Sequence, residues 1–202
     1  MRRLVVRSVI GLFLLAAVVA TTHCGSGGVG HPCIPEDEYR TLFSGFGATE
    51  VYVESRSFQC MTRVCLVDHF QGRVSCPYGQ TEDDLSLPGD DPKRCRVPAT
   101  DGREEGEEIE VAVDPWLVAR PPEDAVYCSC RCDGPDPSAD YCECPSGYAC
   151  RELVPDLGPL GSGNLAGSYC VKDGGNPSRA ATVDCRANPE HEDCPDPAFV
   201  NP

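Results

Sequence analysis

The sequence predicts a small disulfide-rich fold, mainly β with irregular loops and little helix outside an N-terminal signal peptide. Three features support this prediction. The chain of 202 residues contains 15 cysteines, it contains 19 prolines and 20 glycines, and its large core-forming residues are limited to six phenylalanines, seven tyrosines and one tryptophan. Such a chain buries little apolar surface for its length and depends on covalent cross-links.

Residues 1–23 have the layout of a secretory signal peptide. Arg2, Arg3 and Arg7 precede an uncharged apolar run over residues 9–20, which is too short for a permanent transmembrane helix. We therefore expect the mature protein to be exported. Cleavage near Ala20 would give a soluble secreted form, whereas cleavage after residue 23 would place Cys24 at the new N-terminus.

The stretch "ATTHCGSGGVG", with Cys24 just after the apolar run and before a Gly-rich segment, resembles the lipidation site of bacterial lipoproteins. With its cysteine-rich, acidic body, the chain resembles uncharacterised surface lipoproteins of the myxobacterial type. The resemblance implies a lipidated Cys24, a tether over residues 24–32 and a position at the outer membrane, because Gly25 stands where an aspartate would favour retention. A secreted or periplasmic protein is the alternative.

Cysteine parity agrees with lipidation of Cys24. Without it, fourteen cysteines remain, and an even set in an exported protein predicts disulfides throughout. These candidate disulfide residues are Cys33, Cys60, Cys65, Cys76, Cys95, Cys128, Cys130, Cys132, Cys142, Cys144, Cys150, Cys170, Cys185 and Cys194.

Composition divides the exported chain into three parts. We expect an N-terminal β-rich disulfide unit over residues 33–100, a C-terminal Cys-rich unit over 101–172, and a Pro-rich tail over 173–202, held mainly by Cys185 and Cys194. Five of the fourteen cysteines precede residue 100 and nine follow it, so complete pairing requires at least one disulfide between the two sides.

Local patterns predict a few elements of the first unit. Residues 50–55, "EVYVES", alternate in the manner of a strand. Residues 58–70 carry apolar residues at both helical and strand spacing, which leaves their type open. "CPYG" at 76–79 is suited to a type I turn, and "CPSG" at 144–147 predicts the same turn again.

An acidic stretch over residues 81–110 joins the two units. It has eleven acidic and four basic residues, so we expect most of it to be a solvated loop, with strand character returning at 109–113 and Trp116 as the largest candidate for burial. Residues 1–23 hold three of the 17 basic residues and none of the 32 acidic ones, which leaves a net charge of −18 on the mature chain. This charge excludes nucleic acid as a partner and leaves the lipid as the membrane contact.

Six cysteines crowd into residues 128–150, "CSCRCDGPDPSADYCECPSGYAC". If "CSCRC" is one extended strand, its cysteines share a face. Residues two apart on a strand lie near the limit for a disulfide, so each cysteine should bond a different partner, some of them among Cys142, Cys144 and Cys150. The end of the segment, "CECPSGYAC", resembles the tail of an epidermal growth factor module.

Two metal sites are alternatives to this stapled structure. Closely spaced thiolates suit copper(I) or zinc. Acidic residues at 82–84, 90–91, 104–110 and 133–140 offer oxygen ligands for calcium, but they lack the EF-hand pattern. We expect disulfides and solvated loops instead, with no metal and no cofactor.

Catalytic motifs do not stand out. The four histidines are His23, His31, His69 and His191, and the chain contains no nucleophile elbow, phosphate loop or zinc-protease helix. We expect the Asp68-His69 pair to be a surface or capping feature and the protein not to be an enzyme.

These observations predict an exported, lipid-anchored cell-envelope protein with a binding, adhesive or structural role. Its partner would be an envelope or extracellular protein or a glycan. A soft-metal or calcium binding protein and a secreted disulfide-rich hydrolase inhibitor are the alternatives.

Overall fold

A computed structural model describes residues 28–100, 106–158, 165–174 and 183–195. This part of the chain is mainly β and folds into two small antiparallel sheets of three strands each. Seven disulfides cross-link it, so the predicted fold class is confirmed.

The first sheet has the order β1-β2-β3 and contains strands from both sides of residue 100. Its strands are β1 (Val51–Glu54), β2 (Val64–Asp68) and β3 (Val126–Ser129). Strand β1 lies within the predicted strand at 50–55, and β2 settles the type of residues 58–70, which contain no helix. In this register Leu66 of β2 faces Val53 on one side and Tyr127 on the other.

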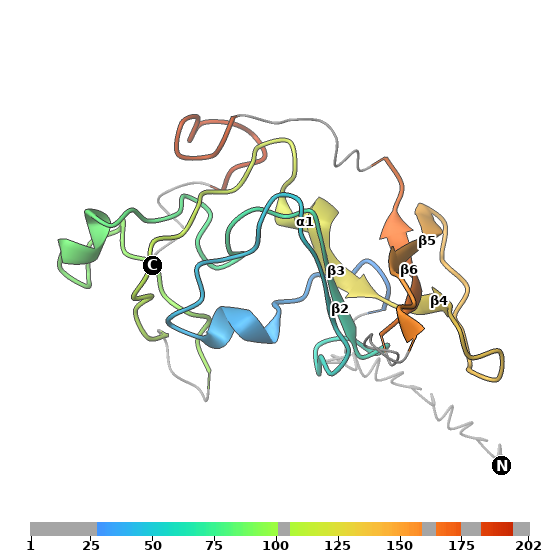
Figure 1. Ribbon diagram of the computed structural model, residues 1–202. Helices are drawn as coiled ribbons and strands as arrows, with labels where there is room; N and C mark the ends of the chain where they lie inside the picture. The colour runs from blue at the N-terminus through green and yellow to red at the C-terminus, as the bar shows by residue number, and fades with distance from the viewer. Residues whose placement is uncertain (1–27, 101–105, 159–164, 175–182, 196–202) are drawn as a thin grey trace, which may run out of the picture.

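The second sheet has the order β4-β6-β5 and is built from the C-terminal half. Its strands are β4 (Arg131–Asp133), β5 (Tyr148–Val154) and β6 (Gly167–Lys172). Figure 1 shows this sheet at one end of the molecule, with the short helix of residues 84–86 at the opposite end. The described helices are single turns: η1 (Glu36–Tyr39), η2 (Asp84–Ser86) and α1 (Pro122–Ala125).

Strand β2 is buried on both faces because it is the central strand between two cores. Side chains alternate along a strand, so Cys65 and Val67 belong to the main core while Val64 and Leu66 pack with Tyr169 of the second sheet. The main core also contains Trp116, which is 8% exposed, in agreement with its predicted burial.

Residues 109–113 are not a strand, contrary to expectation. Val113 forms only an isolated bridge with Gln80. The buried Gln80 side chain donates hydrogen bonds to the carbonyls of Ile109 and Val111, at 2.9 and 2.6 Å. An amide side chain thus satisfies groups that a neighbouring strand would otherwise pair.

The described part of the acidic stretch over residues 81–110 is mostly a loop with accessible side chains, but it also has a small interior. Cys95 is bonded to Cys76 and packs with Val97 and Ile109 in a small satellite core. The nearby Arg94 is 7% exposed and pairs with Glu108 at 2.9 Å. Most of the described residues of this stretch are exposed or half-buried, so the prediction of a mostly solvated loop is confirmed, and one disulfide and one arginine give the stretch its small interior.

Glu38 and Arg73 are fully buried next to the main core. The Arg73 guanidinium donates to the backbone carbonyls of Glu38, Arg40 and Phe43. The Glu38 carboxylate accepts hydrogen bonds from Val74 and Ser75. Burial raises the pKa of Glu38, although these hydrogen bonds and the Arg73 charge oppose the change.

The two expected turns are different. A hydrogen bond from the Gly79 amide to the Cys76 carbonyl closes the first, with the proline at its second position as predicted. The second is closed one residue later, from Tyr148 to Pro145, and puts Gly147 (φ +86°) at its third position. A positive φ at that position is typical of a type II turn, so the prediction of one shared turn was wrong.

The tail packs against both units. Cys185 and Cys194 bond to each other, and Cys185 lies in the main core. The Cys185 amide donates to the carbonyl of Trp116, and Arg186 pairs with Asp84 at 3.0 Å. Residues 183–195 are therefore held by packing and by an ion pair as well as by their own disulfide.

Candidate functional site

All fourteen cysteines between residues 33 and 194 are paired. The disulfides are Cys33–Cys65, Cys60–Cys128, Cys76–Cys95, Cys130–Cys142, Cys132–Cys150, Cys144–Cys170 and Cys185–Cys194. Cys60–Cys128 joins the two sides of residue 100, as cysteine parity requires. The predicted lipidation site, Cys24, lies outside the described residues.

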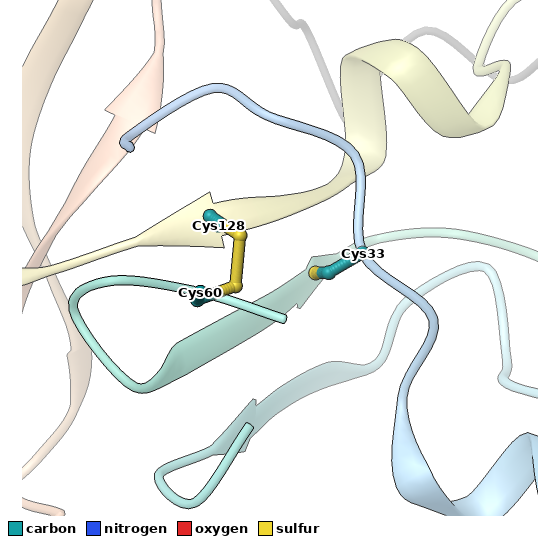
Figure 2. Close-up of side chains that lie close together, drawn as sticks. All are labelled: Cys33, Cys60 and Cys128. Carbon is teal, nitrogen blue, oxygen red and sulfur yellow. A yellow bond between two sulfur atoms is a disulfide. The ribbon is translucent and has the colours of Figure 1, made fainter. Parts of the chain in front are cut away.

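Two of these disulfides lie side by side in the main core. Figure 2 shows the Cys60–Cys128 bond with the Cys33 sulfur close to it, and the three sulfurs lie within 4.8 Å of one another. These residues are at most 3% exposed. A thiolate in solution cannot reach them without unfolding, so they are structural cross-links.

Three further disulfides form what we term the C-terminal sulfur cluster: Cys130–Cys142, Cys132–Cys150 and Cys144–Cys170. The Cys170 sulfur lies 3.6 Å from that of Cys130 and 3.8 Å from that of Cys142. In contrast to the buried core pair, this cluster reaches the surface at Cys150, which is exposed, while Cys144 is half-buried.

The segment "CSCRC" is not one strand. It leaves the first sheet after Ser129 and enters the second at Arg131, with Cys130 between the two. Its three cysteines bond Cys60, Cys142 and Cys150 respectively, so each has a different partner, as expected. The three sulfurs therefore do not form one row on a single strand face, because the chain passes from the first sheet to the second within the segment.

Within the described residues, three sets of three side chains lie close enough together to hold a metal ion, and every potential ligand atom in them is a cysteine sulfur. In each of the three sets the sulfurs belong to disulfides, and a disulfide sulfur is not the thiolate that binds copper or zinc. The acidic residues proposed for calcium form no set of three carboxylates at ligand spacing within this part of the chain.

Asp68 and His69 do not form a simple surface pair. The Asp68 carboxylate is buried and contacts Nδ1 of His69 and the Arg120 guanidinium, each at 2.7 Å. Arg120 also donates to the Asp68 carbonyl at 2.8 Å. The expected surface position of Asp68 was wrong. Its carboxylate can be buried because the buried guanidinium of Arg120, 52 residues away, pairs with it.

The loop over residues 55–63 connects β1 to β2 and borders an open groove. Cys60 ties the loop to β3. The Gln59 side chain donates to the carbonyl of Ile34 at 2.8 Å and accepts from its amide at 3.0 Å. The Ser57 amide donates to the carbonyl of Arg63 at 3.0 Å. Contacts at both ends and the middle thus fix the loop.

The groove has a volume of about 630 Å³ and lies between this loop and η1. Its lining includes Ile34, Glu36, Tyr39, Glu54, Arg56, Ser57, Phe58, Gln59 and Arg63. Phe58 was expected to contribute to the core but is 80% exposed. Sequence reasoning did not identify this groove, because its lining combines residues 34–39 with residues 54–63, two segments that only the fold brings together.

Comparison with known proteins gives no match: no family model, no curated protein and no solved structure is similar to this chain. In the described residues, helices long and apolar enough to cross a membrane are absent.

Proposed function

We propose that this protein is exported, anchored by a lipid on Cys24 at the outer membrane, and acts as a binding module outside the cytoplasm. The observation that carries the proposal is the complete pairing of the fourteen other cysteines. Disulfides persist in oxidising compartments and are rare in the cytosol. The pairing leaves unaccounted for only the cysteine that follows the apolar run.

The N-terminal sequence gives independent support. A basic start and a short apolar run direct export, and a Gly-rich segment follows Cys24 directly. One acyl chain binds a membrane only marginally, so stable anchoring needs the multiple acylation that the lipoprotein resemblance implies.

Acylation tests the proposal directly. The full chain would be expressed in a Gram-negative host with an alkyne-bearing fatty acid, alongside the Cys24→Ala variant. We expect labelled wild-type protein in the outer-membrane fraction and no label on Cys24→Ala. Gly25→Asp is the matched control for sorting and should remain labelled but move to the inner membrane. Absence of label from the wild type, or label retained by Cys24→Ala, would contradict the anchor.

The hydrolase inhibitor is the second candidate, because the loop over 55–63 exposes Phe58 and Met61 on a fixed frame. The shape of this loop favours a binding module over a hydrolase inhibitor. The Arg63 amide donates to the Cys60 carbonyl, which makes residues 60–63 a tight turn, whereas a protease cleft takes an extended segment. If the protein inhibited a protease saturably and the Met61→Ala variant did not, the hydrolase inhibitor would become the preferred function.

A further inference from the structure

The groove beside the 55–63 loop has the side chains of a protein-binding site. Phe58 lines the groove and is 80% exposed, and the guanidinium carbon of Arg63, which also lines it, lies 4.3 Å from the centre of the Phe58 ring. Aromatic residues and arginine are enriched where proteins bind one another. A cation over an aromatic ring also keeps that ring in place while one face stays open.

The groove has a basic side and an acidic side. Residues 55–63 contain Arg56 and Arg63 and no acidic residue, in a mature chain of net charge −18. The other side presents Glu36 of η1 and Glu54 at the end of β1, where Glu54 accepts a hydrogen bond from the Glu36 amide at 3.0 Å. Burial raises the pKa of Glu54, the hydrogen bond from the Glu36 amide opposes this change, and the charges of Glu36 and Asp37 add to it.

A buried hydroxyl group without a hydrogen-bond partner is a second indication that the groove binds a ligand. Ser57 is 2% exposed and lines the groove, and its Oγ has no hydrogen-bond partner among the described residues. Buried polar atoms are nearly always paired, by protein, water or a ligand. The loop around Ser57 is already fixed, so binding there costs little ordering of the protein.

We propose that this groove binds an extended peptide segment of a partner protein, with an apolar side chain against Phe58 and Ile34. A carboxylate of the segment faces Arg56 and Arg63, and a basic group faces Glu36 and Glu54. This assignment deepens the proposed binding role and depends on it. The volume is that of a small-ligand site, enough for a few residues.

Other occupants fit the charges less well. A neutral glycan would leave the arginines and glutamates without counter-charges. A second copy of this chain would bring together two bodies of charge −18. A peptide supplies both charges and an apolar side chain in one short segment.

Selection from a displayed library of random dodecapeptides tests the proposal, with the disulfide-intact mature protein as bait. We expect enriched peptides to combine an acidic, an apolar and a basic residue. Synthetic peptides of the selected sequence should bind Phe58→Ala at least about tenfold more weakly than the wild type. The double variant Arg56→Glu, Arg63→Glu should lose the preference for the acidic residue.

Leu157→Ala is the matched control, because Leu157 is 65% exposed and outside the groove. It should leave peptide affinity unchanged. Thermal unfolding checks that each variant is folded. Because the Phe58 side chain is exposed, we expect Phe58→Ala to unfold at nearly the same temperature as the wild type.

Three results would overturn the assignment. The first is no enrichment over a blank surface, and the second is equal binding of selected peptides to Phe58→Ala. The third is Phe58-dependent binding of defined neutral or uronic-acid oligosaccharides without peptide binding, which would make the groove a glycan site. If any of these occurs while Cys24 is acylated, the groove assignment fails and the proposed export and anchoring remain.

Discussion

Cys65 and Cys128 lie directly opposite each other on β2 and β3, yet each forms its disulfide with a third residue. Cys65 bonds Cys33, before the sheet, and Cys128 bonds Cys60, in the β1-β2 loop. Hydrogen bonds already join the two strands, so the disulfides instead attach the flanking segments to the sheet. The loop that borders the groove owes its position to this arrangement.

We predict that the Cys60–Cys128 disulfide contributes more to stability than Cys185–Cys194. Their sequence separations are 68 and 9 residues. The chain-entropy model assigns about 4 kcal/mol to the longer loop and about 2.7 kcal/mol to the shorter one. Urea unfolding of the two double Cys→Ala variants measures the difference. Because Ala replaces buried cysteines in both, equal losses would contradict the loop-length explanation.

We predict that disulfides break in order of their exposure. Limited reduction at acid pH, followed by alkylation and peptide mass analysis, should label Cys132 and Cys150 first, since both are accessible. Cys60 and Cys128, at 1% and 0% exposed, should be labelled last. At neutral pH, a thiolate released at Cys170 can attack the adjacent Cys130–Cys142 bond, so mixed pairings should appear there. Early labelling of Cys60 would contradict the burial of the core pair.

The Asp68–Arg120 ion pair should be strongly coupled. Their side chains are 5% and 7% exposed and 2.7 Å apart. Removal of one partner leaves the other charge buried and unpaired, which costs about 3–5 kcal/mol. We expect Asp68→Asn and Arg120→Met each to lower the free energy of unfolding by this amount, and the double variant to lose much less than the sum. Additive losses in the double-mutant cycle would show that the pair does not interact.

Asp84 should make the attachment of the tail sensitive to acid. Burial tends to raise the pKa of Asp84, but hydrogen bonds from Thr81 and the Arg186 guanidinium outweigh it and hold the pKa below its usual 3.8. A lowered folded-state pKa stabilises the protein above pH 3.8, and this contribution is lost as the pH falls through the folded-state value.

Asp84→Asn should therefore reduce stability by about 2 kcal/mol at pH 7, as expected for hydrogen bonds to a charged group. The difference from the wild type should shrink below about pH 4. Urea unfolding at pH 7 and pH 3 provides the comparison. A difference that is the same at both pH values would assign the loss to packing rather than to the charge.

The sequence was sufficient for the fold class because composition and cysteine parity are global properties. It also identified the strand at 51–54, where apolar and polar residues alternate over a short distance. It failed at 109–113, because the partner of this segment is the Gln80 side chain rather than a strand. Local alternation cannot distinguish these two environments.

The groove depends on contacts that the sequence does not encode locally. An exposed Phe58 and a buried Phe70 look alike in sequence, and they differ because Cys60–Cys128 and the Gln59 hydrogen bonds turn the loop outward. Likewise, the buried charges of Glu38 and Arg73 come from segments more than thirty residues apart. Charged residues are usually exposed, so no local pattern marks them for burial.

We propose an exported body in which every cysteine except Cys24 is cross-linked. The decisive measurement is the intact mass of the protein from its native envelope, with and without reduction and alkylation. We predict a lipid increment on Cys24 and fourteen newly alkylated thiols after reduction. A chain that begins near Thr21, or thiols that react before reduction, would contradict it.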